Sequence, residues 1–148
     1  MITGPAKQIF VNLPVRDLKK SMAFYQALGF SINPQFTDDK GACIVIGNHI
    51  FAMLLSEPFF KTFTKKSVAD ASRAAEVMTA ISLDSRQRVD DLADKALQSG
   101  GSGNMPPQDH GWMYLRSFQD PDGHICEVVY ADESKIPAEP GAKATAKS

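Results

Sequence analysis

The same order of elements occurs twice along this chain of 148 residues: a β-strand, an amphipathic helix and then further β-strands. The opening strand of each half ends at a hydrophobic residue, Val15 or Leu83, two positions before an acidic or hydroxylic residue that can cap a helix. Repetition of whole structural units signals a duplicated module. The sequence therefore predicts an α+β chain of two tandem β-α-β-β-β modules.

In the first half, each element has its own signal. Residues 8–15 are apolar and β-branched, as in a strand. Residues 17–30 place their apolar side chains on one helical face, and residues 30–36 predict a second strand. The runs GACIVIG and HIFAMLLS follow as a predicted hairpin, because turn-forming residues separate them.

The second half has matching signals. Residues 77–83 read as the opening strand, and Ser85 is placed to cap the helix that follows. After a loop rich in Gly and Pro, the runs WMYLRSF and HICEVVY predict two strands. The residues QDPDG between these runs favour a tight turn.

These signals divide the chain into four parts. We predict a first module over residues 7–56, a connector over 57–75 and a second module over 76–131. Residues 132–148 have little to bury, and we expect this tail to be disordered.

Charge and hydropathy exclude several function classes. The chain has 16 basic and 17 acidic residues and a net charge of -1, with no basic stripe for nucleic acid. No apolar run approaches the roughly 20 residues that cross a bilayer, and the first residues lack a secretory pattern. We therefore expect a cytoplasmic protein with no nucleic-acid or membrane partner. Cys43 and Cys126 lie in apolar runs, which favours buried small hydrophobes over a disulfide or reactive thiol.

One acidic residue, Glu127, interrupts the strand-like run HICEVVY. Burying an ionised carboxylate without a partner costs several kcal/mol, so such a group is normally paired, neutralised or bound to a metal. Glu127 therefore faces either water or a site.

Two stretches together carry a resemblance to a known family. VNLPVRDLKKSMAFYQALGF opens the first module and FQDPDGHICEVVY closes the second. In this order the chain resembles the vicinal oxygen chelate superfamily, which holds glyoxalase I, bleomycin-resistance proteins, fosfomycin-resistance proteins and extradiol dioxygenases. Within it, the chain is similar to bacterial proteins labelled predicted lactoylglutathione lyases. The likeness spans residues 7–131.

The resemblance implies two modules whose curved mixed sheet surrounds a cavity, with metal ligands projecting inward from four strands. In metal-dependent members, a divalent ion held in this way supports lyase or dioxygenase chemistry. Glu127 matches the ligand position in the last strand of the second module, so the resemblance makes it the candidate catalytic and metal-binding residue.

The other three ligand positions hold no donor. The motif places the first-strand ligands at Phe10 and Met78, and the last strand of the first module offers only apolar candidates, residues 51–53. A catalytic divalent site usually has at least three protein donors. The usual ligand set is therefore incomplete.

Other side chains allow a metal site with fewer and weaker donors. Period-2 alternation puts Asn12 on the face of Phe10, and Ser82 on the face of Met78. His110 precedes the strand that we pair with the Glu127 strand, so a set of His110, Glu127 and Asn12 is one hypothesis for a divalent metal. In the alternative, His110 is an ordinary loop histidine and His124 is exposed to solvent.

The remaining candidates would bind an organic ligand. Tyr114 and Arg116 share one strand face, where Arg116 would pair with Glu127 or clamp an anion. Some apolar residues lie at or near the positions that hold metal ligands in the superfamily. They would form a pocket for flat or apolar molecules, or they would pack as an ordinary hydrophobic core. These residues are Phe10, Phe51, Met53, Met78 and Trp112.

Three functions stay open from the sequence. The first is a superfamily protein that binds a small organic molecule in the central cavity, with lyase or dioxygenase activity left undecided. The second is a metal-free binding or sequestering protein of the resistance type. The third is an interaction module with a filled cavity. The apolar side chains of the connector lead us to expect a homodimer.

Overall fold

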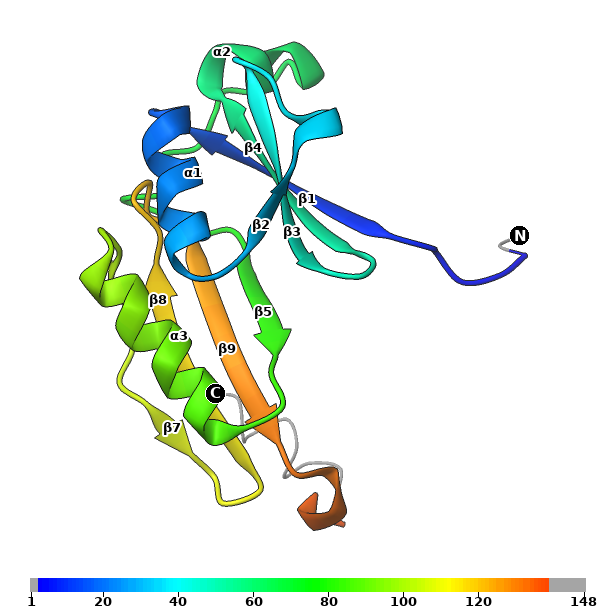
Figure 1. Cartoon of the computed structure of the whole chain (residues 1–148), viewed down its shortest axis with the longest axis vertical. Helices are drawn as coiled ribbons and strands as arrows, with labels where there is room; N and C mark the ends of the chain where they lie inside the picture. Colours follow the sequence, from blue (N-terminus) through cyan, green and yellow to red (C-terminus); the bar gives the residue numbers. More distant parts are fainter. Residues whose placement is uncertain (1–2, 139–148) are drawn as a thin grey trace. The chain divides into compact units, whose positions relative to one another are not determined.

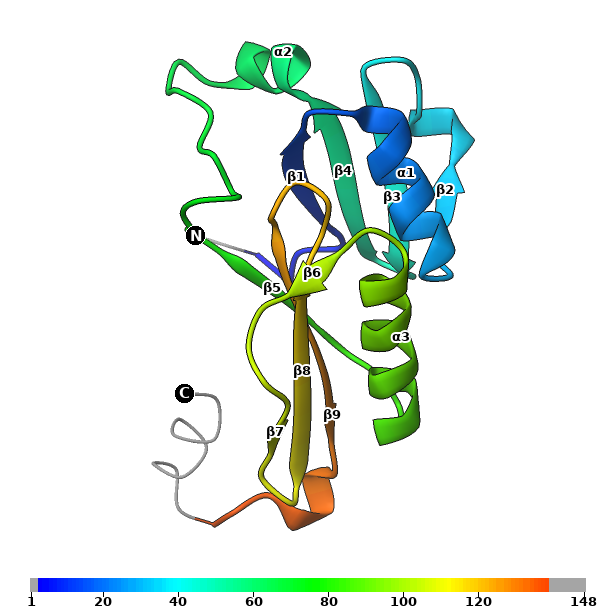
Figure 2. The same cartoon turned by 90° about the vertical axis from the view of Figure 1, so that its left-hand side faces the viewer.

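The computed structural model describes residues 3–138, and their contacts group them into two units. The first unit holds the described chain up to Ala74 together with Pro121–His124. The second holds Ala75–Asp120 and the described chain from Ile125 onward. Figures 1 and 2 show the elements of each unit.

The first unit is a four-stranded sheet with one long helix. Its strands follow the order β1-β4-β3-β2, with β1 parallel to β4 and the other neighbours antiparallel. The elements are β1 (Ile9–Val15), α1 (Leu18–Ala27), β2 (Ser31–Asn33), β3 (Gly41–Gly47), β4 (Ile50–Ser56) and the short α2 (Glu57–Phe60).

Strand residues alternate between the two faces of this sheet, and helix α1 packs on one of these faces. On the covered face, Val15, Ile44 and Leu54 are fully buried. Phe24 and Tyr25 of α1 pack in the same core, with their rings edge to face at 5.1 Å. The apolar periodicities of strand and helix thus meet in one core, as the sequence predicts.

Two carboxylates satisfy the N-terminus of α1. Asp17 caps the helix by accepting from the Lys20 N–H at 3.1 Å. Asp122 accepts from the Arg16 N–H at 2.9 Å and from the Ser21 hydroxyl at 3.1 Å. Both Asp122 and Ser21 are buried. The second aspartate of the DPDG turn, Asp122, is therefore a structural hydrogen-bond acceptor of the first unit.

Gly123 follows in the same turn and has no room for a side chain. Its φ is +95°, and an added Cβ would lie 2.6 Å from the Ala71 carbonyl oxygen. His124 comes next, and its Nε2 lies 2.7 Å from the Pro14 carbonyl oxygen. His124 is partly buried, so the expectation that it is solvent-exposed was wrong.

We predict that Asp122→Ala lowers the free energy of unfolding by about 2 kcal/mol, because the buried Ser21 hydroxyl and the Arg16 N–H both lose an acceptor. Urea denaturation followed by circular dichroism measures this loss. Asp39→Ala, at an exposed position, is the matched control and should change stability little. Equal stability of the two variants would contradict the assigned role of Asp122.

The second unit repeats the order of the first. Its main sheet runs β5-β9-β8-β6, with β5 parallel to β9, and β7 pairs with β8 beside this path. The elements are β5 (Met78–Ser82), α3 (Arg86–Gln98), β6 (Ser102–Gly103), β7 (Gln108–Asp109), β8 (Met113–Gln119) and β9 (Ile125–Ala131).

Helix α3 begins after Ser85, whose side chain accepts from the Arg88 N–H at 3.1 Å. Its buried face, Val89, Leu92, Ala93 and Ala96, packs on β8 and β9, where Phe118 and Val128 are buried. The prediction of an α+β chain with two β-α-β-β-β modules is confirmed in this order of elements.

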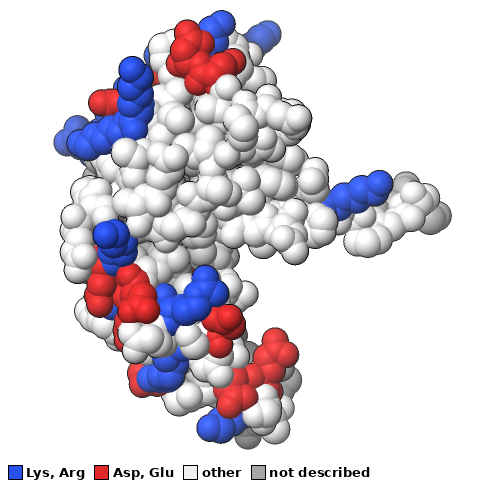
Figure 3. Space-filling view, in the orientation of Figure 1, with Lys and Arg blue, Asp and Glu red and all other residues white. Residues whose placement is uncertain are grey.

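Two further expectations concern the ends and the surface. Within the predicted disordered tail, Glu133–Lys135 form a 3-10 turn, and residues 139–148 lie outside the described residues. Among the described residues, no helix has the length and apolar character to span a membrane. On the face drawn in Figure 3, charges of both signs are interspersed over the lower part.

Candidate functional site

The strand register of the second unit places Glu127 on the sheet face that is turned away from α3. Glu127 pairs with Ser117 of β8 on one side and with Ala80 of β5 on the other. Phe118 and Val128, the next residues along, point to the helix-covered face. A residue two positions before Ser117, Leu115, shares the face of Glu127.

A cavity of about 180 Å³ lies over this face. Methionine, proline and leucine side chains give it an apolar part, and Glu127 with its polar neighbours gives it a polar part. Its lining consists of Met78, Asn104, Met105, Pro106, Gln108, Leu115, Ser117 and Glu127. We call it the Glu127 cavity. Only Met78 and Glu127 of this lining were predicted from the sequence.

The polar part of the Glu127 cavity consists of two amides, a hydroxyl and a carboxylate, from Asn104, Gln108, Ser117 and Glu127. The Ser117 hydroxyl oxygen accepts from Asn104 Nδ2 at 3.1 Å and from the Met105 N–H at 3.2 Å. The Gln108 Oε1 atom is buried and has no hydrogen-bond partner in the described part of the chain. Glu127 itself is 8% exposed. The cavity therefore presents the Gln108 Oε1 acceptor to a ligand.

Tyr114 and Arg116 lie on the opposite face and do not line this cavity. Arg116 forms ion pairs with Asp90 at 3.2 Å and with Asp94 at 2.8 Å, both on α3. The Tyr114 hydroxyl donates to Asp90 at 2.6 Å, and burial followed by this hydrogen bond raises the pKa of Tyr114. The predicted Arg116–Glu127 pair was wrong, because alternation along β8 sends Arg116 to the side that α3 covers.

His110 and Trp112 lie near the far end of the same sheet. The His110 N–H donates to the Met113 carbonyl, and Met113 pairs with Ala131. Ala131 lies four residues beyond Glu127 on β9, which is about 13 Å along a strand. His110 is exposed and the prediction that it shares a metal with Glu127 was wrong. Trp112, also predicted to line a pocket, is not part of the Glu127 cavity lining.

The predicted site residues of the first unit share the sheet face turned away from α1. Phe10 pairs with Phe51, and two residues further along both strands Asn12 pairs with Met53. The Phe10 and Phe51 rings are stacked with centroids 4.8 Å apart, while Phe10 remains 46% exposed. This face is therefore apolar and aromatic, with the Asn12 amide beside it, and its role as a ligand pocket stays a prediction.

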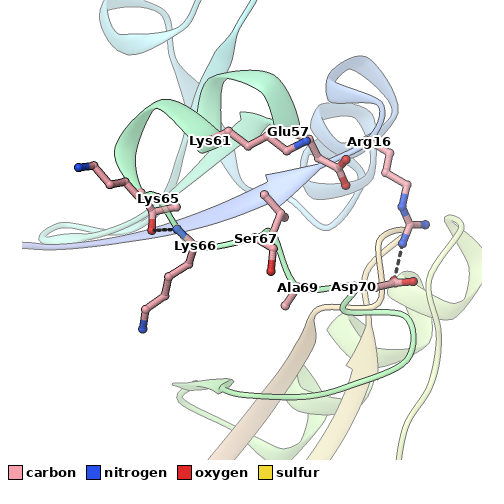
Figure 4. A pocket seen from close by; sticks show the side chains of 10 residues that line it. Arg16, Glu57, Lys61, Lys65, Lys66, Ser67, Ala69 and Asp70 are labelled. Carbon is pink, nitrogen blue, oxygen red and sulfur yellow. Dashed lines mark hydrogen bonds and ion pairs between the residues drawn. The ribbon is translucent and has the colours of Figure 1, made fainter.

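A second hollow, of about 650 Å³, lies along the connector of the first unit (Figure 4). Sequence reasoning missed it because the connector follows no periodic pattern. Arg16 and Asp70 form an ion pair across it at 2.8 Å, and Lys61 extends toward Glu57. Hydrogen bonds from Ser72, with the Arg16 charge adding, lower the pKa of Asp70. Its remaining lining is Thr64, Lys65, Lys66, Ser67, Val68 and Ala69.

Neither cysteine has the environment of a nucleophile. Burial, with smaller contributions from the Asp120 and Glu127 carboxylates, raises the pKa of Cys126 to about 12. Burial also raises the pKa of Cys43. A reactive cysteine instead needs a lowered pKa, because the thiolate is the attacking form. Cys43 and Cys126 are both free thiols.

We predict that iodoacetamide at pH 8 labels neither cysteine in the folded chain, and labels both after unfolding in guanidinium. The folded Cys126 thiol stays protonated until the pH nears about 12, whereas an unfolded thiol ionises near 8.5. Peptide mass spectrometry of the labelled chain measures this difference. Labelling of native Cys126 at the rate of a free thiol would contradict it.

The donor set does not fit the divalent metal that the superfamily resemblance implies. In the described part of the chain, no group of three or more His, Cys, Asp and Glu residues is placed to hold a metal ion. Inside the Glu127 cavity, one carboxylate stands among amide and hydroxyl oxygens and thioethers. Transition metals need imidazole, thiolate or several carboxylate donors, so these residues are a poor site for zinc, nickel or iron.

Comparisons show which known proteins resemble this chain in sequence and in fold. The family model for the bleomycin resistance protein-like N-terminal domain matches residues 7–47. The structure of a hypothetical protein from S. aureus is 30% identical, with a TM-score of 0.73, and the match covers 86% of this chain and 96% of that one. A search of curated proteins found no match.

Two more distant structures share the fold. A glyoxalase/bleomycin resistance protein/dioxygenase family enzyme from Burkholderia phytofirmans has 17% identity and a TM-score of 0.68, covering 82% of this chain and 96% of that one. A bleomycin resistance determinant encoded on transposon Tn5 has 21% identity and a TM-score of 0.60, covering 86% and 99%. Residues 7–47 thus match a bleomycin resistance protein-like N-terminal domain, and the chain has the fold of structures from the glyoxalase, bleomycin resistance and dioxygenase superfamily, also called the vicinal oxygen chelate superfamily.

Proposed function

We propose that this protein binds a small organic molecule in the Glu127 cavity and that binding does not require a metal ion. The observation that carries the proposal is the lining of this cavity, which combines apolar side chains with a few polar groups. One of these is the buried Gln108 Oε1, which has no hydrogen-bond partner among residues 3–138. Such a mixture is typical of small-molecule sites. In this reading the protein works by binding or sequestering its ligand.

The fold relatives support this class of function. One of them is a bleomycin resistance determinant, and another is a fosfomycin resistance protein from Mesorhizobium loti. The second candidate is lyase or dioxygenase chemistry, which Glu127 favours because it matches a ligand position of metal-dependent members. That chemistry needs further metal donors, and Phe10 and Met78 offer none.

The ligand-binding proposal predicts a specific response of the methionine methyl groups. With ¹³C-methyl-methionine labelling, a fragment that occupies the Glu127 cavity should shift the Met78 and Met105 signals, because both side chains line it. Met22 on α1 belongs to the first unit and is the internal control.

The affinity of such a fragment should be the same after treatment with EDTA. Loss of binding on EDTA treatment, restored by zinc or nickel, would favour the metal-dependent candidate instead. Failure of a fragment collection to shift either methyl would contradict the binding proposal itself.

We also propose that the protein acts as a cytoplasmic homodimer. Phe10 stacks on Phe51 on the sheet face turned away from α1 and remains 46% exposed, and at the start of β1 and β4 the opposite face exposes Ile9 (55%) and Ile50 (43%). Exposed apolar patches of this kind mark interaction surfaces.

Sedimentation equilibrium should therefore give twice the mass of the chain, 16.1 kDa. Phe10→Asp should weaken the dimer by placing a charge on the apolar face that Phe10 shares with Phe51. Exposed Lys19→Asp on α1 is the control for the added charge. A monomer at all concentrations would contradict the dimer.

A further inference from the structure

The hollow along the connector carries a surplus of positive charge. It lies on residues 57–70 together with Arg16, all within the first unit, and we call it the connector hollow. Its lining holds four basic and two acidic residues, namely Arg16, Lys61, Lys65 and Lys66 against Glu57 and Asp70. The whole chain has a net charge of -1, so this surplus is local to the connector hollow.

The positive charge is left uncompensated mainly at one end of the hollow. At the other end, Arg16 is paired with Asp70 at 2.8 Å (Figure 4). Lys65 and Lys66 are exposed, and neither forms an ion pair within residues 3–138. A lysine stem is flexible, so both ammonium groups can turn toward a ligand in the hollow. An anion bound there would gain two counter-charges.

Hydrogen-bond donors without acceptors lie beside these charges. The backbone N–H groups of Ser67, Val68 and Ala69 have no acceptor in the described part of the chain. A backbone N–H is an obligatory donor, so each of these groups is left for water or a ligand. The Thr64 hydroxyl accepts from the Lys66 N–H at 3.1 Å, which leaves its own O–H as a further donor. A ligand group with several acceptor oxygens matches this set of donors.

Size and polarity narrow the kind of molecule. The volume of about 650 Å³ lies in the usual range for small-molecule sites. Val68 and Ala69 are the two aliphatic residues of the lining, so a polar ligand suits the hollow better than an apolar one. A phosphate group combines negative charge with several acceptor oxygens, and lysine binds it as a point charge. A recess also suits a molecule free in solution better than the flat surface of a membrane.

We propose that the connector hollow binds a small anionic molecule that carries phosphate groups. Lys65 and Lys66 supply the counter-charges, and the N–H groups of Ser67, Val68 and Ala69 supply donors to the phosphate oxygens. The connector hollow shares no residue with the Glu127 cavity, so binding at one site stands or falls without the other.

Titration of the full chain with pyrophosphate at constant ionic strength tests the proposal, with backbone amide NMR signals as the readout. We expect saturable shifts of the Ser67, Val68 and Ala69 amide signals, and weaker binding of inorganic phosphate because it carries less charge. The amides of α3, in the second unit, are the internal control. The absence of shifts at the three connector amides would overturn the proposal.

Charge variants test the assigned residues. Lys65→Gln combined with Lys66→Gln should weaken pyrophosphate about tenfold, because two ion pairs at an exposed site are lost. Lys19→Gln combined with Lys20→Gln is the matched control, since these two adjacent lysines are exposed in the same unit and do not line the hollow. Glu57→Gln removes a negative charge from the lining and should tighten binding severalfold.

Equal losses in the two lysine pairs would overturn the assignment to the connector hollow, since they would show attraction by the charge of the whole unit. Lipid headgroups are a second source of phosphate, so co-sedimentation with phosphatidylcholine vesicles that contain phosphatidic acid is measured in parallel. We expect no co-sedimentation. Co-sedimentation that is lost in the Lys65→Gln and Lys66→Gln variant would overturn the proposal in favour of a membrane surface. The titration of the unmodified chain stands even if a variant fails to fold.

Discussion

The candidate site depends on the alternation of side chains along β8 and β9. Because successive residues of a strand point to opposite faces, one face of this strand pair meets α3 and the other lines the Glu127 cavity. Phe118 and Val128 pack under the helix, and Arg116 forms ion pairs with its aspartates. A shift of the register by one residue would place Glu127 in the helix core and empty the cavity of its charge.

The stretch from Asp122 to Glu127 holds two buried acids with different tasks. Asp122 has its oxygens engaged by the Arg16 N–H and the Ser21 hydroxyl, so it stabilises the start of α1. Glu127 lies five residues later in a cavity whose lining contains no cation. The first carboxylate is thus held by two donors of the first unit, whereas the task that we propose for the second is to bind a ligand. One short stretch therefore carries a structural carboxylate and the carboxylate of the candidate site.

Much of the fold could be predicted from the sequence, because apolar periodicity marks strands and helices and Asp17 and Ser85 mark the helix starts. That Phe10 and Met78 offer no metal donor can be read directly from the sequence. The face of Arg116 did not, because alternation groups residues without saying which group a helix covers. Asn104, Met105 and Gln108 were missed, since they lie in or beside a Gly- and Pro-rich loop whose path depends on tertiary contacts.

The central claim is that Glu127 serves a binding cavity that works without a metal ion. Metal content tests this claim most directly, measured by elemental analysis after dialysis of the full chain against zinc, nickel, iron and manganese in turn. The account predicts far less than one equivalent of each metal per chain, with the same content in Glu127→Gln. Close to one equivalent of any of these ions, lost in Glu127→Gln, would contradict it.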